Sequence, residues 1–485
     1  MRLSLSRKNL WDKCPRAARN CIGSILGMLP SRYVLGQAFR SKSRFVEGTQ
    51  LWSGERAKRY QTEQLVRICT LARNETEYYR EIFGKVGFCP EDLKSAGDVQ
   101  GLPTIDKAIL RENLERMCAR SPRGRTVDYI STGGSSGTPL WFYIGRERSA
   151  VEYAYLTASW KRAGYELGMP MVVLRGRLVK PNRNGLRHEY DPILRHHYYS
   201  NFHTADEDLA RYVRHMATVG ACFLHAYPSS AMAIARYCRR SGTRPPENIR
   251  GIILESENVY ADQRQTMEEV FGSRVFSCYG HSEKLVLAAE CEHSTDYHVW
   301  PTYGYCELLD DEGRAVTEPG RRGEIVGTGF INTVIPFIRY RTGDYATYVG
   351  EQCEACGREH MIIRDIEGRW PSGDLVANDG SYISMTALNV HDDTFSRVRQ
   401  FQFYQDTPGV AVLRVVPAEG FDESDRRKIL HNMGRKLDGR LTFSIELVDA
   451  IRLTPRGKAI YVDQRIPGVG SRETKVNPAS GAGER

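Results

Sequence analysis

Apolar residues in the middle of the chain recur in short runs that alternate with stretches of helical periodicity. The runs cover residues 171–174, 222–224, 251–254 and 275–278. The helical stretches between them cover 207–216, 229–239 and 262–270. Strands separated by helices of this length imply a parallel sheet covered on both faces. The pattern therefore predicts an α/β fold whose ligand lies at the carboxyl ends of the strands.

The flanking regions have different patterns. Helical periodicity marks 55–83, 107–117 and 147–162, whereas short alternating runs at 305–309, 323–326 and 336–341 predict a β region. After Pro371, strands at 401–404, 410–416 and 444–447 with a helix at 422–437 predict a small α+β unit. We expect a basic N-terminal arm (1–54), a large α/β core domain with a parallel sheet plus the β region (55–368), a small mobile α+β C-terminal domain (369–466) and a disordered tail (467–485).

Composition limits the class of protein. The 485 residues are 41% hydrophobic and 26% charged, as in globular proteins. No apolar run approaches the roughly eighteen residues of a membrane span, and 21–30 is short and lacks a clear cleavage site, so we expect no secretory signal and a cytoplasmic protein. Most of the twelve cysteines are isolated, which indicates reduced thiols.

Positive charge is concentrated at the N-terminus. Residues 1–60 carry 13 Lys and Arg against three acidic residues, a balance of +10 within a total of +9. Interspersed apolar residues such as Ile22, Ile25 and Met28 suit weak contact with an anionic membrane face. A solvated arm is the alternative that we favour. No recognition module accompanies the charge, so we expect no nucleic-acid partner.

The stretch Ser131–Leu140, STGGSSGTPL, holds three glycines and five hydroxyl residues in ten positions. Glycines let a backbone approach a ligand closely, and consecutive N–H and hydroxyl groups suit phosphate oxygens. A P-loop is excluded because no lysine follows Gly137; a flexible linker is the alternative. We predict a phosphate-binding loop of Ser131, Thr132, Gly133, Gly134, Ser135, Ser136, Gly137 and Thr138.

Polar and aromatic clusters follow three of the predicted strands. They are His225-Ala-Tyr227-Pro228, Glu255-Ser256 and Tyr279-Gly-His-Ser-Glu283. We expect His225, Tyr227 and Pro228, with the Arg-, His- and Tyr-rich segment 187–203, to border a substrate pocket. The polarity of that segment favours a polar substrate.

Five motifs occur in one order over nearly the whole chain: the loop, the Tyr279–Glu283 cluster, Tyr340-Arg-Thr-Gly-Asp344, Gly368-Arg369 and Gly457-Lys458. This set resembles the adenylate-forming enzymes, specifically the phenylacetate-CoA ligase-like branch with its capsule-locus, CapK-like relatives. The resemblance implies an AMP-forming acid–thiol ligase that uses ATP and Mg²⁺ to activate a carboxylic acid and passes the acyl group to coenzyme A. An amine or hydroxyl acceptor in polysaccharide biosynthesis, or a degenerate nucleotide-binding scaffold, are the alternatives.

The resemblance also implies roles for single residues. Glu283 would be the Mg²⁺ ligand and Lys458 the small-domain lysine that reaches the reacting groups. Tyr279 would lie along the adenine, with Glu255 and Ser256 near its exocyclic edge. Asp344 would accept the ribose hydroxyls and Arg369 would contact ribose or phosphate. Without the resemblance, Glu283 suits a surface carboxylate, Asp344 a turn and Lys458 a solvated side chain.

The chain departs from the family pattern at two places. Many relatives carry a lysine shortly after the loop, where Pro139-Leu140 stands here. The usual aspartate two residues after the arginine is replaced in Arg369-Trp370-Pro371. The hinge residue is therefore not assigned.

Cysteine and histidine form a second candidate group. Cys353 and Cys356 have the C-x2-C spacing that places two thiolates on one Zn²⁺. Cys291 and His298 resemble the other half of a zinc site seen in some phenylacetate-CoA ligase-like proteins, which implies a closed structural Cys3His site. His293, Cys306 or His360 could substitute as ligands, and unliganded thiols are the alternative.

Overall fold

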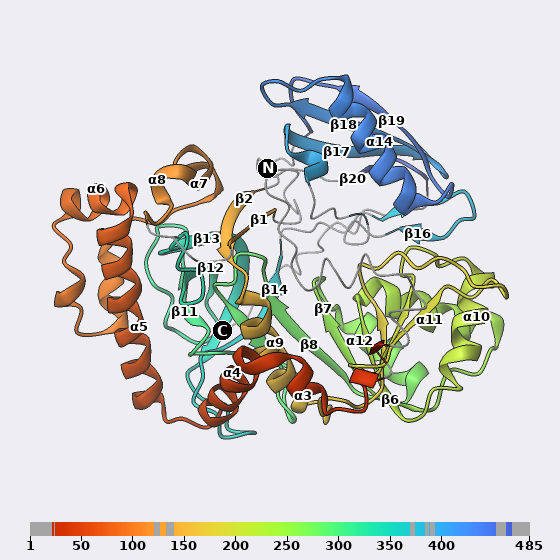
Figure 1. The fold of residues 1–485 in the computed structure, drawn as a ribbon, viewed down its shortest axis with the longest axis horizontal. Helices are drawn as coiled ribbons and strands as arrows, with labels where there is room; N and C mark the ends of the chain where they lie inside the picture. Colours follow the sequence, from red (N-terminus) through yellow and green to blue (C-terminus); the bar gives the residue numbers. More distant parts are fainter. Residues whose placement is uncertain are drawn as a thin grey trace, which may run out of the picture. The chain divides into compact units, whose positions relative to one another are not determined.

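The computed structural model describes residues 22–23, 25–120, 127–131, 140–368, 374–383, 388, 393–452 and 462–467 (Figure 1). The described residues up to 368 form one compact unit, and those from 374 onward form another. Each unit has its own sheet and its own buried core.

The first unit contains a twelve-stranded mixed sheet. Its spatial order is β11-β12-β13-β14-β10-β9-β8-β7-β6-β3-β5-β4. Neighbouring strands from β5 to β8 are parallel, while those from β8 to β11 are antiparallel. The strands are β3 Met171–Leu174, β4 His188–Asp191, β5 His196–Tyr199, β6 Cys222–Ala226, β7 Ile249–Glu255, β8 Val275–Gly280, β9 Leu287–Ala289, β10 Tyr297–Val299, β11 Gly304–Leu309, β12 Arg322–Gly329, β13 Tyr340–Gly350 and β14 Ile362–Glu367.

Helices cover both faces of the parallel half. On β3, Val172 and Leu174 face a core shared with α10 (Asp206–Met216), α11 (Pro228–Ser241) and α12 (Ala261–Phe271). The alternate residues, Met171 and Val173, pack with Trp160 of α9 (Arg148–Lys161). Because strands buried on both faces read as continuous apolar runs, the predicted alternation of strands and helices is confirmed in this region.

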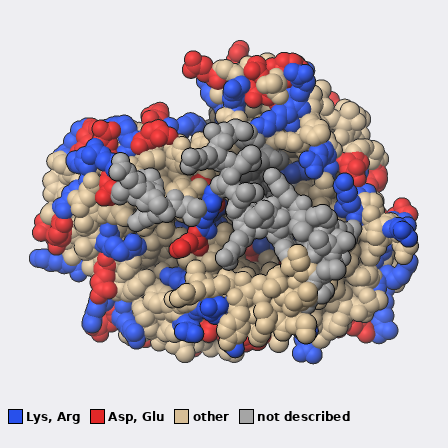
Figure 2. Space-filling view, viewed as in Figure 1, with Lys and Arg blue, Asp and Glu red and all other residues tan. Residues whose placement is uncertain are grey.

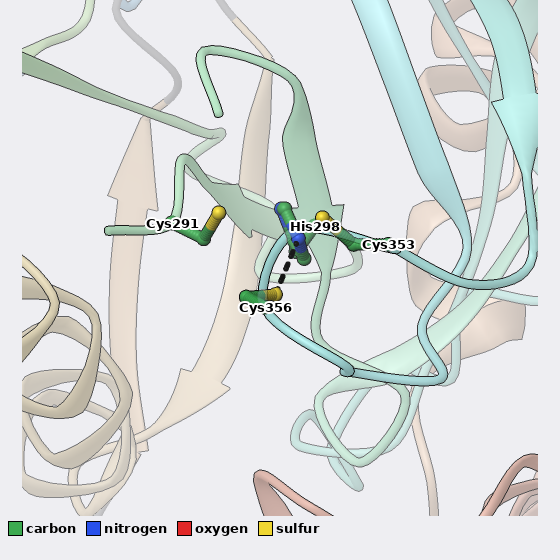
Figure 3. A group of neighbouring side chains, drawn as sticks. All are labelled: Cys291, His298, Cys353 and Cys356. Atoms are coloured by element: carbon green, nitrogen blue, oxygen red, sulfur yellow. Dashed lines mark hydrogen bonds between the residues drawn. The ribbon is translucent and has the colours of Figure 1, made fainter. Parts of the chain in front are cut away.

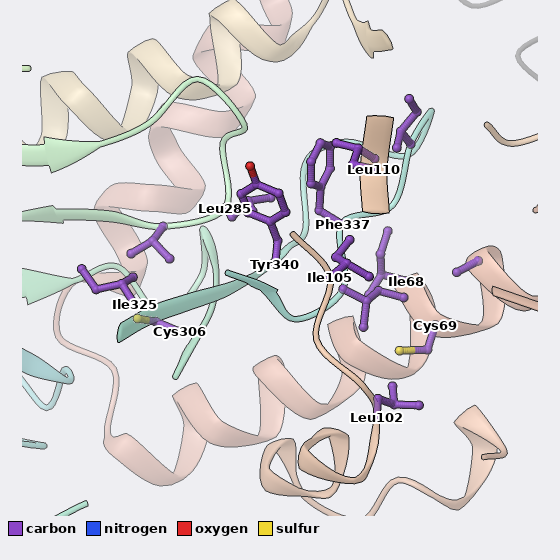
Figure 4. Packing of buried hydrophobic residues seen from close by; sticks show 14 of the residues in the cluster. Ile68, Cys69, Leu102, Ile105, Leu110, Leu285, Cys306, Ile325, Phe337 and Tyr340 are labelled. Atoms are coloured by element: carbon purple, nitrogen blue, oxygen red, sulfur yellow. The ribbon is translucent and has the colours of Figure 1, made fainter. Parts of the chain in front are cut away.

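The antiparallel half has a separate core (Figure 4). Ile68 of α5 (Gly54–Glu75) and Phe83 of α6 (Glu77–Val86) pack there with side chains of the sheet. The predicted helix over 55–83 is two helices, because Thr76 has an extended backbone and its Oγ1 accepts a hydrogen bond from Tyr79 N (3.3 Å) as the N-cap of α6. Two short helices follow, α7 Lys107–Glu112 and α8 Leu114–Met117, and then the hairpin of β1 Val127–Ser131 and β2 Trp141–Gly145.

The strand predicted at 336–341 begins only at Tyr340. Pro336 has no N–H to donate to a ladder, and Arg339 has a positive φ of 51°. Its guanidinium is buried and paired with Glu307, with 3.1 Å between Nη2 and Oε1. This turn directs the chain into β13.

Part of the predicted basic arm is helical and packed on the first unit. The helices α3 (Ser31–Val34) and α4 (Gly36–Thr49) lie at the red end of the colour scale in Figure 1. Phe39 and Val46 of α4 are buried in a cluster with Tyr155 of α9. No helix in the described part of the chain has both the length and the apolar character of a membrane span.

The second unit is an α+β layer pair. Its four-stranded sheet has the order β19-β18-β17-β20, and α14 (Glu423–Leu437) packs on one face through Ile429 and Met433. The strands of the unit are β15 Leu375–Val376, β16 Tyr382–Ile383, β17 Val398–Thr407, β18 Val410–Pro417, β19 Thr442–Leu447 and β20 Val462–Gln464. The predicted small α+β unit is confirmed in these elements.

Candidate functional site

Tyr279 and Asp344 meet at the carboxyl end of β8. The Tyr279 hydroxyl donates a hydrogen bond to Asp344 Oδ2 at 2.9 Å. Three strands separate β8 from β13 in the sheet order, so a flat sheet would hold them about 19 Å apart. The antiparallel half must therefore curl, and this curl brings the two side chains together.

Glu283 is 3% exposed, and its partners in the described part of the chain include a tyrosine and a histidine. The Tyr340 hydroxyl lies 3.2 Å from Oε1. His281 Nδ1 lies 3.3 Å from Oε2, while His281 Nε2 accepts the backbone N–H of Val286 at 3.3 Å. Because Nε2 is an acceptor, Nδ1 carries the proton that is donated to Glu283. The carboxylate is thus held in one orientation before any ligand arrives.

Glu255 lies at the end of β7, beside the end of β8, and its carboxylate is used within the protein. Oε1 accepts Trp160 Nε1–H at 3.0 Å, and Oε2 accepts Arg175 Nη1–H at 2.7 Å. Arg175 Nη1 also lies 2.9 Å from His225 Nε2, and its Nη2 donates to Ser256 Oγ at 3.0 Å. Arg175 therefore joins the ends of three parallel strands.

The side chains of this cluster stabilise one another's charge states. Burial alone would raise the pKa of Glu255, but the Arg175 charge and the contacts of His225 hold that pKa well below its usual range. Burial and the adjacent Arg175 lower the pKa of His225. The cluster is accordingly an Arg–carboxylate ion pair beside a neutral imidazole.

The predicted pocket residues lie at the end of β6 and the start of α11. His225 contacts the Arg175–Glu255 pair, Tyr227 lies under the Arg175 guanidinium with 5.5 Å from Cζ to its ring centroid, and Pro228 is the first residue of α11. The segment 187–203 contains the hairpin β4–β5 at the sheet edge. The structure thus places these residues at the same sheet end as Glu255.

Several predicted residues lie outside the described part of the chain. They are Thr132, Gly133, Gly134, Ser135, Ser136, Gly137 and Thr138 of the loop, then Arg369 and Lys458. The backbone of Ser131 is described as the last residue of β1, paired with Trp141. Most of the predicted tail, 468–485, is also outside.

The four predicted zinc ligands converge, as Figure 3 shows. The ligand atoms of Cys291, His298, Cys353 and Cys356 all lie within 4.8 Å of one another, and Cys356 Sγ is 3.3 Å from His298 Nε2. Ligand atoms on one tetrahedral Zn²⁺ lie about 3.5–3.8 Å apart, given metal–ligand distances of about 2.0–2.3 Å. The donor set and its spacing therefore fit this ion.

The surroundings orient these ligands. The carbonyl oxygen of Asp296 lies 3.0 Å from His298 Nδ1, which leaves Nε2 to face the thiols. Cys291 Sγ accepts the backbone N–H groups of His293 and Ser294. Burial raises the pKa of Cys353 to about 11, whereas hydrogen bonds from Arg358 outweigh burial and lower the pKa of Cys356.

The alternative ligands are not part of this group. His293 contributes its backbone, Cys306 is buried in the core of the antiparallel half, and the His360 ring centroid lies 6.3 Å from that of His298. Among the described residues, the Cys3His set is the combination that converges.

Sequence reasoning missed two residues of the site. Trp160 and Arg175 hold Glu255, yet neither was singled out. Arg175 directly follows the apolar run at 171–174, so a charged residue at a strand end was the available signal. Trp160 gave no such signal, because an aromatic residue on a helix is typical of a core.

Comparison with known proteins gives a matching family model, several relatives in sequence and similar solved structures. Residues 375–465 match the family model of the CapK C-terminal domain. The chain is 23% identical over 414 residues to protein CapK of Staphylococcus aureus, covering 84% of this chain and 89% of CapK. It is 22% identical over 426 residues to a phenylacetate-coenzyme A ligase of Pseudomonas putida, covering 84% and 94%.

Among solved structures, 2-hydroxyisobutyryl-CoA ligase in complex with 2-HIB-AMP and CoA superposes with a TM-score of 0.57 at 20% identity, covering 86% of this chain and 91% of that one. The chain therefore shares the fold of this CoA ligase. In sequence, the chain is similar to CapK and to phenylacetate-coenzyme A ligase over 84% of its length.

Proposed function

We propose that this protein activates a carboxylic acid with ATP to give an acyl adenylate, and then transfers the acyl group to coenzyme A. One observation supports this most directly. The family resemblance assigns Tyr279, Glu283 and Asp344 to nucleotide and Mg²⁺ binding. Segments 279–283 and 340–344 contact each other through two hydrogen bonds, from Tyr279 to Asp344 and from Tyr340 to Glu283. Homologues named phenylacetate-CoA ligase give the reaction class.

The chemistry proceeds in two displacements. A substrate carboxylate oxygen attacks the α-phosphorus of ATP, and the bond to the leaving pyrophosphate breaks. The thiolate of coenzyme A then attacks the acyl carbon, and AMP leaves with the electron pair of the acyl–oxygen bond. Because little covalent chemistry falls to the protein, positioning and charge stabilisation supply the catalysis.

The described residues have separate proposed roles in positioning the substrates and stabilising charge. Glu283 is the proposed Mg²⁺ ligand, and its hard oxygens suit that cation. A bound Mg²⁺ would supply neutralisation of the phosphate charge. Asp344 is the proposed acceptor of the ribose hydroxyls, with Tyr279 holding its Oδ2 in place. Glu255 acts by fixing Arg175, which in turn donates a hydrogen bond to Ser256, where the adenine edge and the acyl group are expected.

The remaining proposed contacts come from residues outside the described part. The loop 131–138 would surround the phosphates with hydroxyl and backbone N–H donors, Arg369 would contact ribose or phosphate, and Lys458 would pair with the carboxylate and the α-phosphate. The absent lysine after the loop places more of the phosphate charge on these groups.

We also propose that Cys291, His298, Cys353 and Cys356 hold a structural Zn²⁺. The support is the converging donor set of three thiols and one imidazole. Four protein ligands leave no open coordination position, so the ion would fix the ends of β9 and β10 to the 353–358 turn without taking part in the reaction.

The acid and the acceptor are narrower proposals. Arg175, His225 and the His- and Tyr-rich hairpin 188–199 favour an acid with polar substituents. Similarity to CapK, whose name specifies no thiol acceptor, keeps an amine or hydroxyl acceptor as the second candidate.

The decisive experiment measures ATP-dependent pyrophosphate release with aryl, fatty, amino and hydroxy acids, with and without coenzyme A, while hydroxylamine traps adenylates. We expect release and a trapped hydroxamate with one polar acid class, and turnover that requires coenzyme A. A Lys458→Ala variant that folds but releases no pyrophosphate would support the assigned lysine. Absence of ATP binding by the wild-type chain would overturn the proposal.

A further inference from the structure

The described N-terminal segment exposes a dense group of large apolar side chains. Thirteen large hydrophobic side chains are exposed in the described part of the chain, and five of them fall within residues 22–33. These five are Ile22, Ile25, Met28, Leu29 and Tyr33. Met28 is 85% exposed and Ile25 is 69% exposed. Clustered exposure of this kind marks an interaction site rather than ordinary surface.

This segment is attached to the folded body. Ser31 Oγ donates a hydrogen bond to the carbonyl of Ile193 at 2.6 Å, in the turn between β4 and β5. The helix that follows, α4, is fixed on α9, where the rings of Phe39 and Tyr153 lie 5.7 Å apart. The exposed apolar side chains are therefore next to elements that are packed on the first unit.

Basic side chains border the apolar group, and no acidic residue occurs between Asp12 and Glu47. The guanidinium carbons of Arg32 and Arg40 lie 5.2 and 5.3 Å from the ring centroid of Tyr33. In the space-filling view, basic side chains lie among uncharged surface in the region of α3 and α4 (Figure 2). Positively charged groups thus lie next to side chains that prefer an apolar medium.

The combination of exposed apolar side chains and arginines indicates the chemistry of the partner. An aromatic ring flanked by arginines, next to exposed aliphatic chains, suits the boundary between lipid headgroups and acyl chains. A second copy of the same surface would oppose arginines to arginines. We infer that the segment 22–40 docks on an anionic lipid surface, with Ile25, Met28 and Leu29 entering the headgroup boundary while Arg32 and Arg40 contact lipid phosphates.

Vesicle flotation of the full-length chain tests this inference. We expect the protein to float with vesicles of phosphatidylcholine and phosphatidylglycerol in equal parts, to stay behind with phosphatidylcholine alone, and to be released by high salt. Arg32→Gln/Arg40→Gln should lower partition by about tenfold or more, because each basic residue near an anionic surface contributes roughly fivefold. Ile25→Ser/Met28→Ser should lower it similarly.

Matched variants separate this site from general effects. Val410→Ser/Leu447→Ser removes two exposed apolar side chains from the second unit, and Arg239→Gln/Arg240→Gln removes the same charge from α11. Both controls should float like the wild type. Equal loss in controls and test variants, or no flotation with anionic vesicles, would overturn the inference. So would a concentration-dependent dimer that only the test variants lose, since a second copy would then be the partner.

The inference is independent of the proposed reaction. None of the four variants substitutes a residue of the proposed nucleotide site, so their pyrophosphate release without vesicles should equal that of the wild type.

Discussion

Two groups of buried and half-buried polar side chains satisfy their atoms in different ways. Around Glu283 and Asp344, each carboxylate already accepts a hydrogen bond from a neighbouring tyrosine hydroxyl. In the group of Cys291, His298, Cys353 and Cys356, the ligand atoms face one another instead. The first arrangement suits a ligand that enters and leaves, because its residues stay oriented throughout. The second suits an ion that stays.

The largest expected effect is at the oriented carboxylate. Glu283→Gln keeps the side-chain size but removes the charge, so pyrophosphate release should fall by about 10²–10³-fold, as when one transition-state contact is lost. Thermal unfolding should be nearly unchanged. Glu312→Gln, in an exposed turn, is the matched control. Activity within a few-fold of the wild type would remove Glu283 from the proposed site.

Metal removal should act on stability instead. We expect about one Zn²⁺ for each chain in protein purified without chelator, and chelation should cost about 3 kcal/mol of unfolding free energy if zinc is present at some hundredfold its Kd. Cys356→Ser should abolish both the zinc content and the response to chelator. Cys118→Ser, outside the group, should change neither. A zinc-free wild type with unchanged stability would make the thiols ordinary buried cysteines.

The Arg175–Glu255 pair predicts a dependence on pH. Because the folded protein holds the Glu255 pKa well below the ordinary value of about 4.3, the pair stabilises the fold fully above that pH. The gain is lost progressively as pH falls from there through the lower pKa of the folded protein. Glu255→Gln should cost about 2 kcal/mol near neutral pH, as for a hydrogen bond to a charged group.

Denaturant titrations at several pH values check this expectation. The stabilities of wild type and Glu255→Gln should converge in acid. Glu269→Gln, which breaks an exposed ion pair with Arg239, should differ little from the wild type at any pH. A gap that is constant with pH would show that packing, not charge, sets the cost.

The smallest effect is expected at Tyr279. Tyr279→Phe removes the hydroxyl that holds Asp344, so KM for ATP should rise by about fivefold, equivalent to about 1 kcal/mol for one hydrogen bond. The maximal rate at saturating ATP should be nearly kept. Tyr260→Phe controls for loss of a tyrosine hydroxyl elsewhere. A fall in the maximal rate with unchanged KM would instead place Tyr279 in the chemical step.

The fold was predictable where the burial of an element produces a simple pattern of apolar residues in the sequence. Strands β3, β6, β7 and β8 are apolar runs because both of their faces are covered, and the helices between them follow from their period. The helix α4 was missed, because it buries little more than Phe39 and Val46 on an otherwise polar surface. The break at Thr76 was missed as well, since a single capping hydroxyl interrupts an unbroken helical period.

In the candidate site, too, some residues could be predicted from the sequence and others could not. Glu283, Asp344 and the four cysteine and histidine residues stand in motifs that a sequence displays. Their partners do not, because the contact between Tyr279 and Asp344 depends on how strongly the sheet curls across three intervening strands. The role of Arg175 likewise cannot be predicted from its own position in the sequence, because its partners His225 and Glu255 come from β6 and β7.

The position of the cysteine and histidine group along the chain has a consequence for folding. His298 and Cys356 are 58 residues apart, and the chain between them contains all of β11, β12 and β13. An ion held there would close a loop around the strand that carries Tyr340 and Asp344, and would reduce the conformational entropy of that loop in the unfolded chain. Amide hydrogen exchange in β13 should therefore quicken when the ion is removed, while β3 and β6, which lie outside the loop, keep their protection.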